Sequence, residues 1–259
     1  MTPLDPPRLL TELFHHAVVV GAGKASRMAE AVETAWGPCE GLVITRYGYA
    51  RPCHGIEIVE AAHPVPDQAG VAATGHMLDL LAGLDADDFV LALISGGASA
   101  LLCAPFEGVT LAEKQAVNAA LLTSGAPIGD MNAVRKQLSR FKGGQLAAAA
   151  WPARMLALMI SDAPGDDPAT IGSGPTAGAP GTPAEARAIL DRWSIGPTAA
   201  IEAATAGKRR APATRIGRSQ PHLFEKASRP VQGGGAGFAG ASKGAATIPA
   251  SVWRGLSEE

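Results

Sequence analysis

Residues 17–26 read AVVVGAGKAS, an apolar run that opens into a glycine-bearing loop with one lysine and one serine. Two further stretches repeat this arrangement: residues 89–99 read FVLALISGGAS, and residues 155–167 read MLALMISDAPGDD. A strand of a parallel sheet is buried on both faces and reads as a continuous apolar run, and ligands bind outside the carboxyl ends of such strands. The three loops therefore predict a parallel sheet with a phosphate- and metal-binding site at one edge.

Apolar runs and helical patterns alternate along most of the chain. We predict strands at Ala17–Gly21, Gly41–Arg46, Ile56–Ala61, Phe89–Ile94 and Met155–Ile160. Helices are predicted at Lys24–Trp36, from an N-cap at Asp67 to Leu81, from an N-cap at Thr110 to Ser124, and at Asp130–Phe141, Pro183–Trp193 and Thr198–Ala206. Strands that alternate with helices build parallel sheets. The sequence thus predicts an α/β fold with a three-layer, Rossmann-like, mostly parallel sheet and helices on both faces.

The composition indicates a core of small aliphatic residues, since 47% of the 259 residues are hydrophobic but only 5% are aromatic. No apolar run approaches the roughly 20 residues that cross a bilayer, and no signal-peptide pattern opens the chain, so we expect no membrane partner. Cys39, Cys53 and Cys103 are scattered without metal-ligand spacing. We interpret them as reduced thiols of a cytoplasmic protein.

The last 52 residues differ from the rest in charge and composition. Residues 208–259 carry nine Lys and Arg against three Glu, whereas residues 1–207 are net acidic. The basic residues are dispersed among Gly, Ala, Ser and Pro with few aromatic residues, which disfavours a nucleic-acid partner and favours disorder. We therefore predict an α/β domain over residues 1–207 and a basic tail over residues 208–259 that is disordered or translated out of frame.

The first glycine loop carries Gly21, Gly23 and Lys24 between a strand and a helix. Glycines let the backbone approach a phosphate, and the helix N-terminus adds partial positive charge. The loop falls short of the dinucleotide fingerprint, because Ser26 holds its third small position and Arg46 stands where an acidic ribose ligand is expected. A lysine here suits a transferring phosphoryl group. We assign Lys24 to catalysis and all three residues to nucleotide binding; the alternative is a tight turn with a solvated lysine.

The second loop offers Ser95, Gly96, Gly97 and Ser99 as a cradle of amides and hydroxyls for phosphate. It also approaches the nucleophile elbow of hydrolases. That chemistry needs a histidine later in the sequence, and the only one is His222, in the basic tail, which disfavours a hydrolase.

The third loop carries Asp162, Asp166 and Asp167 within six residues. Mg²⁺ takes one or two carboxylates and shares the phosphates of its substrate. We assign all three residues to a metal site and Asp162 to catalysis as well; the alternative is a helix cap followed by a polar turn.

A basic stretch brings Asn132, Arg135 and Lys136 to one helix face by their spacing. A cationic face suits an anionic substrate; the alternative is a solvated helix surface. His63, between Ala62 and Pro64, is interpreted as structural.

Taken together, these segments resemble the glycerate 2-kinases of the MOFRL-associated family, many of which carry the label hydroxypyruvate reductase. The matching segments are VVGAGKAS (19–26), AHPVPD (62–67), ISGGASALL (94–102), NAVRKQLSRFKGGQL (132–146) and ISDAPGDDPATIGSGPT (160–176), in family order. The resemblance implies ATP-dependent phosphorylation of D-glycerate on its 2-hydroxyl with Mg²⁺, and Lys24 matches the lysine regarded as catalytic. The implied partners are the nucleotide and the acid, and a homodimer is compatible with the resemblance.

The chain departs from the family in length, and two alternatives to a kinase stay open. Family members are longer, and their second domain contributes an active-site arginine, whereas nothing after Gly207 resembles that domain. We therefore expect a truncated or rearranged member with impaired activity. The alternatives are an NAD(P)H-dependent hydroxypyruvate reductase and a catalytically silent remnant or binding module.

Overall fold

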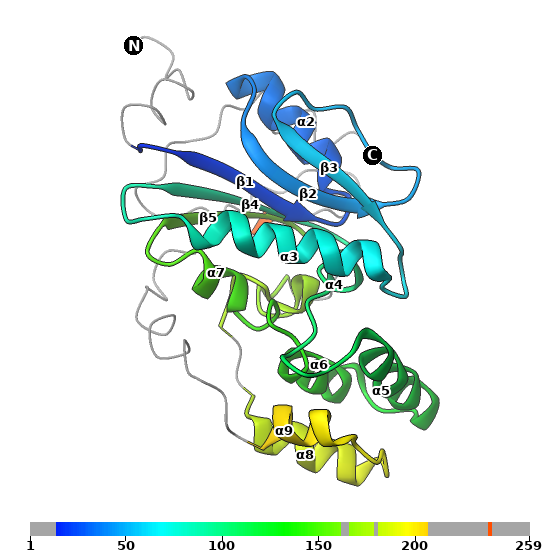
Figure 1. Ribbon diagram of the computed structural model, residues 1–259. Helices are drawn as coiled ribbons and strands as arrows, with labels where there is room; N and C mark the ends of the chain where they lie inside the picture. The colour runs from blue at the N-terminus through cyan, green and yellow to red at the C-terminus, as the bar shows by residue number, and fades with distance from the viewer. Residues whose placement is uncertain (1–13, 162–165, 179–180, 207–237, 240–259) are drawn as a thin grey trace.

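A parallel sheet of five strands forms the centre of the protein (Figure 1). The computed structural model describes residues 14–161, 166–178, 181–206 and 238–239. The strands are β1 (Ala17–Ala22), β2 (Glu40–Arg46), β3 (Ile56–Ala61), β4 (Phe89–Ile94) and β5 (Arg154–Ile160), in the spatial order β3-β2-β1-β4-β5. All four pairings among them are parallel. The predicted α/β fold is confirmed.

The strand order reverses between β1 and β4, and this reversal positions the candidate site. The chain runs outward from β1 through β2 to β3 and then returns to the other side of β1 as β4. Ala22 pairs with Ile94 at the carboxyl ends of these two strands, so the loops that follow them leave the sheet side by side. A crevice at such a switch point is where open α/β sheets bind ligands.

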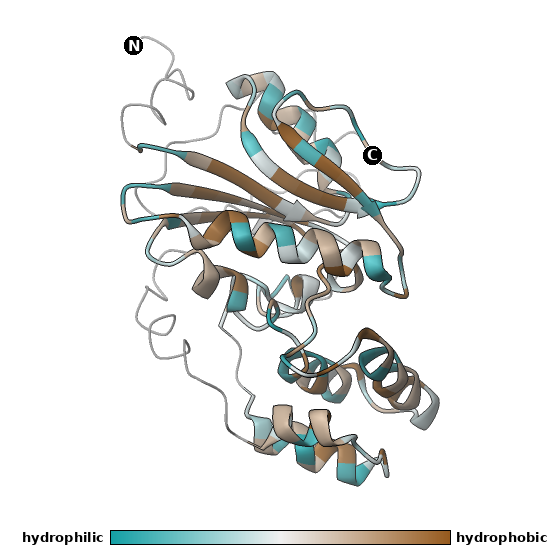
Figure 2. Cartoon of the chain, in the orientation of Figure 1, coloured by the Kyte–Doolittle hydropathy of each residue, from teal (hydrophilic) through white to brown (hydrophobic). Residues whose placement is uncertain are grey.

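Two hydrophobic cores cover the two faces of the sheet. Helix α2 (Ala25–Trp36) packs Met28 and Val32 against Val19 and Leu91 on one face. Helices α3 (Gln68–Ala82), α4 (Ala98–Leu101) and α7 (Gln145–Ala149) cover the other face, where the core includes Leu42, Ile44, Met77 and Leu81. Figure 2 shows the apolar strands between these helices. Each fully buried aliphatic side chain contributes about 1.5–3 kcal/mol, so the alternation of strand residues between the two faces fixes both helix layers.

A third core lies beside the sheet and is built mostly from helices. It joins α5 (Leu111–Ser124), α6 (Ile128–Gln137), α8 (Pro183–Arg192) and α9 (Ala199–Thr205), which lie together below the sheet in Figure 1. Its buried residues include Val117, Leu121, Val134, Leu190 and Ile201. This third core supplies one wall of the candidate site.

Two helices begin directly after the capping residues predicted from the sequence. The carboxylate of Asp67 accepts a hydrogen bond from the backbone N–H of Gly70 at 3.0 Å, and Thr110 forms a reciprocal capping box with Glu113. Both predicted caps are confirmed. Capping satisfies backbone N–H groups that the first helical turn leaves without partners.

Some elements differ from the prediction. Helix α6 ends at Gln137 instead of continuing to Phe141, because Ser139 pairs with Pro105 and its hydroxyl accepts hydrogen bonds from the N–H groups of Phe141 and Lys142. The short helix α4 and the 3-10 turn η1 (Ile171–Ser173) have too few residues to show a period in the sequence.

The division at residue 207 stays a prediction, because residues 207–237 and 240–259 lie outside the described residues. Phe238–Ala239 form β6, which pairs antiparallel with β5 and was not expected from composition. Within the described residues, no helix is long and apolar enough to cross a membrane.

Candidate functional site

The two glycine loops touch at the carboxyl ends of β1 and β4. The backbone N–H of Ser95 donates to the carbonyl of Ala22 at 3.1 Å, and the hydroxyl of Thr45 donates to the carbonyl of Gly23 at 3.0 Å. Gly23 has a φ of +106°, and a Cβ atom on it would lie 2.5 Å from the Ser95 carbonyl oxygen. Only glycine fits there, so the predicted meeting of the two loops is a property of the backbone.

Lys24 lies at the start of helix α2 with its side chain exposed. No side chain caps this helix start, and the hydroxyl of the nearby Ser26 donates instead to the carbonyl of Tyr49 at 2.7 Å. Uncapped N–H groups at a helix N-terminus attract anions. The hydroxyl of Ser95, which lies buried beneath this rim, has no hydrogen-bond partner among the described residues.

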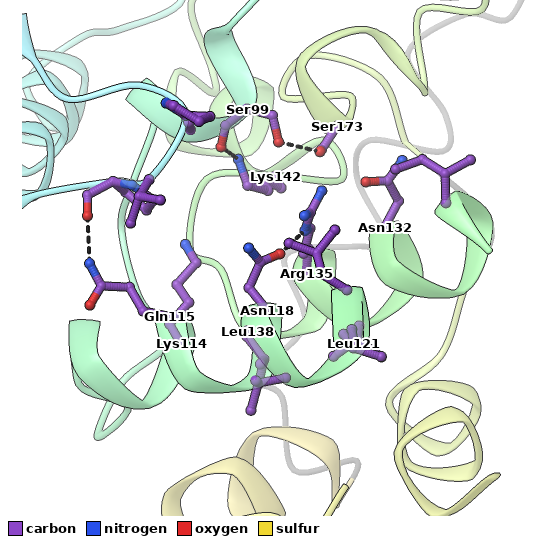
Figure 3. Close-up of a pocket in the computed structure, with 18 of the residues that line it drawn as sticks. Ser99, Lys114, Gln115, Asn118, Leu121, Asn132, Arg135, Leu138, Lys142 and Ser173 are labelled. Atoms are coloured by element: carbon purple, nitrogen blue, oxygen red, sulfur yellow. Dashed lines mark hydrogen bonds between the residues drawn. The ribbon is translucent and has the colours of Figure 1, made fainter. Parts of the chain in front are cut away.

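The β4 loop continues into the wall of a cavity of about 600 Å³ (Figure 3). Gly97, at φ +89°, lies under the ring of His63, and the Ser99 hydroxyl lies 2.8 Å from that of Ser173 in η1. The facing wall comes from α5 and α6. The polar lining comprises His63, Ser99, Lys114, Gln115, Asn118, Asn132, Arg135, Lys142, Thr170 and Ser173. The loop after β4 therefore contributes Gly97 and Ser99 to the lining of this cavity.

Three cations from three segments line this cavity. Lys142 donates to the carbonyl oxygens of Ser99 and Leu102, the Lys114 ammonium lies 3.6 Å from the Cys103 sulfur, and Arg135 Nε donates to Asn118 at 2.6 Å. Lys114 is 8% exposed and Lys142 only 2%. No Asp or Glu belongs to the lining among the described residues. Among the described residues, the cavity is thus a cationic site without a carboxylate in its lining.

Burial shifts the proton equilibria of these groups. Desolvation lowers the pKa of Lys114, and desolvation together with the charge of Lys114 holds the pKa of Lys142 well below its ordinary value. Desolvation also lowers the pKa of Arg135. An anion in the cavity would oppose these shifts, because it stabilises the charged forms.

The predicted substrate residues divide into two groups. Asn132 and Arg135 line the cavity, whereas the Lys136 ammonium donates to the carbonyl of Ala169 at 3.0 Å and is not part of the lining. Lys114 and Lys142 are not among the site residues predicted from the sequence. Lys114 was detectable, because it lies three and seven residues before Val117 and Leu121, on the face that α5 buries.

The predicted metal site is described only in part. Asp162 lies outside the described residues. Asp167 is exposed and caps the turn before η1, accepting hydrogen bonds from the Ala169 N–H and the Thr170 hydroxyl. Asp166 is half-buried at a φ of +52°. The described residues contain no group of three His, Cys, Asp or Glu side chains arranged to hold a metal ion. The metal site stays a prediction.

The end of β2 bears on the alternative of a dinucleotide-dependent reductase. Arg46 lies there with its guanidinium 3.6 Å from the centroid of the Tyr49 ring. A dinucleotide fold places a ribose-binding carboxylate at this end. The structure thus places the Arg46 guanidinium, stacked on Tyr49, where a dinucleotide-binding fold has its ribose-binding carboxylate, which disfavours the reductase alternative.

Residues 5–205 match the family described as "Domain of unknown function (DUF4147)". The chain is 42% identical over 182 residues to a Thermotoga maritima protein named D-glycerate 2-kinase, covering 69% of this chain and 44% of that one. A protein of Agrobacterium vitis with a hydroxypyruvate reductase label is 55% identical over 181 residues, which cover 69% and 41% of the two chains.

The crystal structure of a glycerate kinase from T. maritima is similar to this fold with a TM-score of 0.72 and 38% identity. The similarity covers 78% of this chain and 51% of that one. The chain spans less than half the length of the two curated relatives.

Proposed function

The chain belongs to the DUF4147 family, and from this premise we propose that it transfers a phosphoryl group from ATP to the 2-hydroxyl of D-glycerate. One observation carries the proposal: two glycine loops touch at the switch point of the sheet, and one of them continues into a cationic cavity. The loops suit the phosphates of a nucleotide, and the cavity suits a small acid. Relatives named glycerate 2-kinase support the same pairing of ligands.

The triphosphate would lie along Gly23 and the amides of Gly96 and Gly97. Gly21, which was assigned to the nucleotide from the sequence, lies buried inside β1 and pairs with both β2 and β4, so it shapes the strand end without contacting the ligand. Phosphoryl transfer demands positioning and charge stabilisation more than covalent participation by the protein. The Lys24 ammonium, beside the uncapped start of α2, would stabilise the charge on the transferring group. Asn132 and Arg135 would bind the acid from the facing wall of the cavity.

Mg²⁺ fits the carboxylates of the third loop. Asp166 and Asp167 present carboxylate oxygens, the ligand type that Mg²⁺ prefers, and Asp167 retains lone pairs beyond its two capping bonds. We propose that these two residues hold the ion together with Asp162, which is assigned from the sequence alone. The ion would neutralise phosphate charge.

Cytoplasmic location and a homodimer stay predictions from the sequence.

The proposal is tested by product analysis with the purified chain. ATP, Mg²⁺ and D-glycerate should yield ADP and 2-phosphoglycerate, and Lys24→Met should lower kcat by about 10²–10³-fold, the usual loss of one charge-stabilising donor. Arg140→Met is the matched control, since Arg140 is exposed and absent from the cavity lining. Oxidation of NADPH with hydroxypyruvate, without phosphoryl transfer, would instead identify a reductase. Binding of both ligands without product would identify a silent module.

A further inference from the structure

We infer that Lys114 and Lys142 form a paired-ammonium site that binds the carboxylate of the acid substrate and selects acids over uncharged polyols. The inference rests on the proposed function, because it names the group of the substrate that enters the cavity. Neither lysine is among the residues that the sequence motifs assign to substrate.

The two lysines reach the cavity from separate segments of the chain. Lys114 lies in the first turn of α5, and Lys142 lies in the loop between α6 and α7. Figure 3 shows both ammonium groups directed toward the space that Arg135 and Ser99 also face. Because residues 28 positions apart converge on one cavity, the pairing arises from the tertiary fold.

The two ammonium groups have different hydrogen-bond partners, and this difference indicates that Lys114 is the main ligand-binding residue. Lys142 donates to two backbone carbonyls, which fixes its position and leaves one of its three N–H donors. Lys114 is 8% exposed, and among the described residues its ammonium has one hydrogen-bond partner, the Cys103 sulfur at 3.6 Å. Sulfur is a weak acceptor, so a purely structural role leaves the charge of Lys114 almost unsatisfied.

No ion pair among the described residues compensates this charge. Lys114 and Lys142 take part in none of the salt bridges that join described side chains, and the cavity lining contains no Asp or Glu. Uncompensated buried charges are costly, and burial already lowers the pKa of both lysines. A bound anion supplies the missing counter-charge.

The free donors match a carboxylate. Lys114 and Lys142 offer ammonium N–H groups, and Arg135 uses Nε for Asn118, which leaves its terminal guanidinium donors without a partner in the described part of the chain. A carboxylate has two oxygens that accept several such bonds, and charge-assisted bonds are about twice as strong as neutral ones. A polyol of the same size has no charge to offer in return.

The experiment measures binding by the full chain, without catalysis. Titration calorimetry should detect D-glycerate binding, with glycerol at least about 100-fold weaker, equivalent to about 2.7 kcal/mol. Lys114→Met should weaken D-glycerate binding by at least tenfold, whereas Lys114→Arg should restore most of it. Arg140→Met is the control and should leave affinity unchanged. Lys142→Met is a secondary variant, because it also removes two carbonyl contacts.

Thermal unfolding without ligand separates this role from a structural one. Lys114→Met should unfold at an unchanged or higher temperature, because it removes a buried charge without a counter-charge. A lower Tm together with unchanged affinity would show that Lys114 is structural and would overturn the inference. Equal affinity for glycerol and D-glycerate, or no D-glycerate binding, would overturn it as well. Selective acid binding without phosphoryl transfer would sustain the inference and refute the proposed kinase.

Discussion

Substituting Gly23 by alanine tests the contact between the two glycine loops. The added Cβ would lie 2.5 Å from the Ser95 carbonyl oxygen, 2.6 Å from its hydroxyl and 2.7 Å from the Gly96 carbonyl oxygen. Two of the three obstacles are backbone atoms, so no side chain can rotate to relieve the overlap. The φ of +106° adds strain for any residue with a Cβ.

The expected cost follows from these two effects. A non-glycine residue in a disfavoured backbone region costs about 1–3 kcal/mol, and overpacking costs a further 1–3 kcal/mol or so. We expect Gly23→Ala to destabilise the protein by roughly 4 kcal/mol and to lower Tm by about 10 °C, since domains of this size lose about 2–4 °C per kcal/mol. ATP affinity should fall as well, because relief of the clash separates the loops.

Differential scanning calorimetry and ATP titration measure both effects. Gly75→Ala is the matched control: Gly75 lies in α3, and a Cβ there would meet no atom within 4 Å. Alanine in a helix interior is favoured over glycine by about 1 kcal/mol, so this control should raise Tm slightly. A Gly23→Ala protein with the parent Tm and ATP affinity would refute the contact.

Three further substitutions test the packing around the site. Glu33→Gln should cost about 1–2 kcal/mol, because the buried carboxylate accepts from four backbone N–H groups, including that of His54. Burial opposes ionisation, but those bonds hold the pKa of Glu33 below its ordinary value, so the stabilisation is present above the ordinary pKa of a glutamate and is lost as pH falls through the lowered one. Urea unfolding against pH should show this loss in the parent but not in the variant. Thr110→Ala should remove about 1 kcal/mol in urea unfolding by breaking the capping box, and a larger effect on binding than on stability would contradict that role. Leu190→Ala should cost about 2–5 kcal/mol because Leu190 is fully buried in the helical core; an unchanged Tm would refute that packing.

The sequence was most informative about the fold where one local pattern determines the structure. The run at Phe89–Ile94 is buried at every position, so its continuous apolar pattern gave the strand with correct bounds. Asp67 and Thr110 were recognised as caps because capping needs only residues within one turn. The predicted end of helix α6 is four residues too late, because the helix is ended by the pairing of Ser139 with Pro105, a long-range contact that no local pattern reveals.

The candidate site was only partly predictable for the same reason. Gly23 and Ser95 follow parallel strands, so their meeting could be predicted once the strands were recognised. The cavity depends on how α5 and α6 pack beside the sheet, which no motif encodes. Lys142 reaches it through a turn at Gly143 and Gly144, both with positive φ, and Lys136 points elsewhere although it shares the basic stretch.

The separate helical core has a consequence for cooperativity. Phe141, next to Lys142, is buried in the core under the sheet, whereas α5 and α6, which carry Lys114 and Arg135, belong to the helical core. Because these two cores share no buried residue, we expect them to open separately, and amide hydrogen exchange should resolve two protection levels in the free protein. An anion bound to Lys114, Arg135 and Lys142 at once would link the two cores, so that in its presence both would unfold in a single transition.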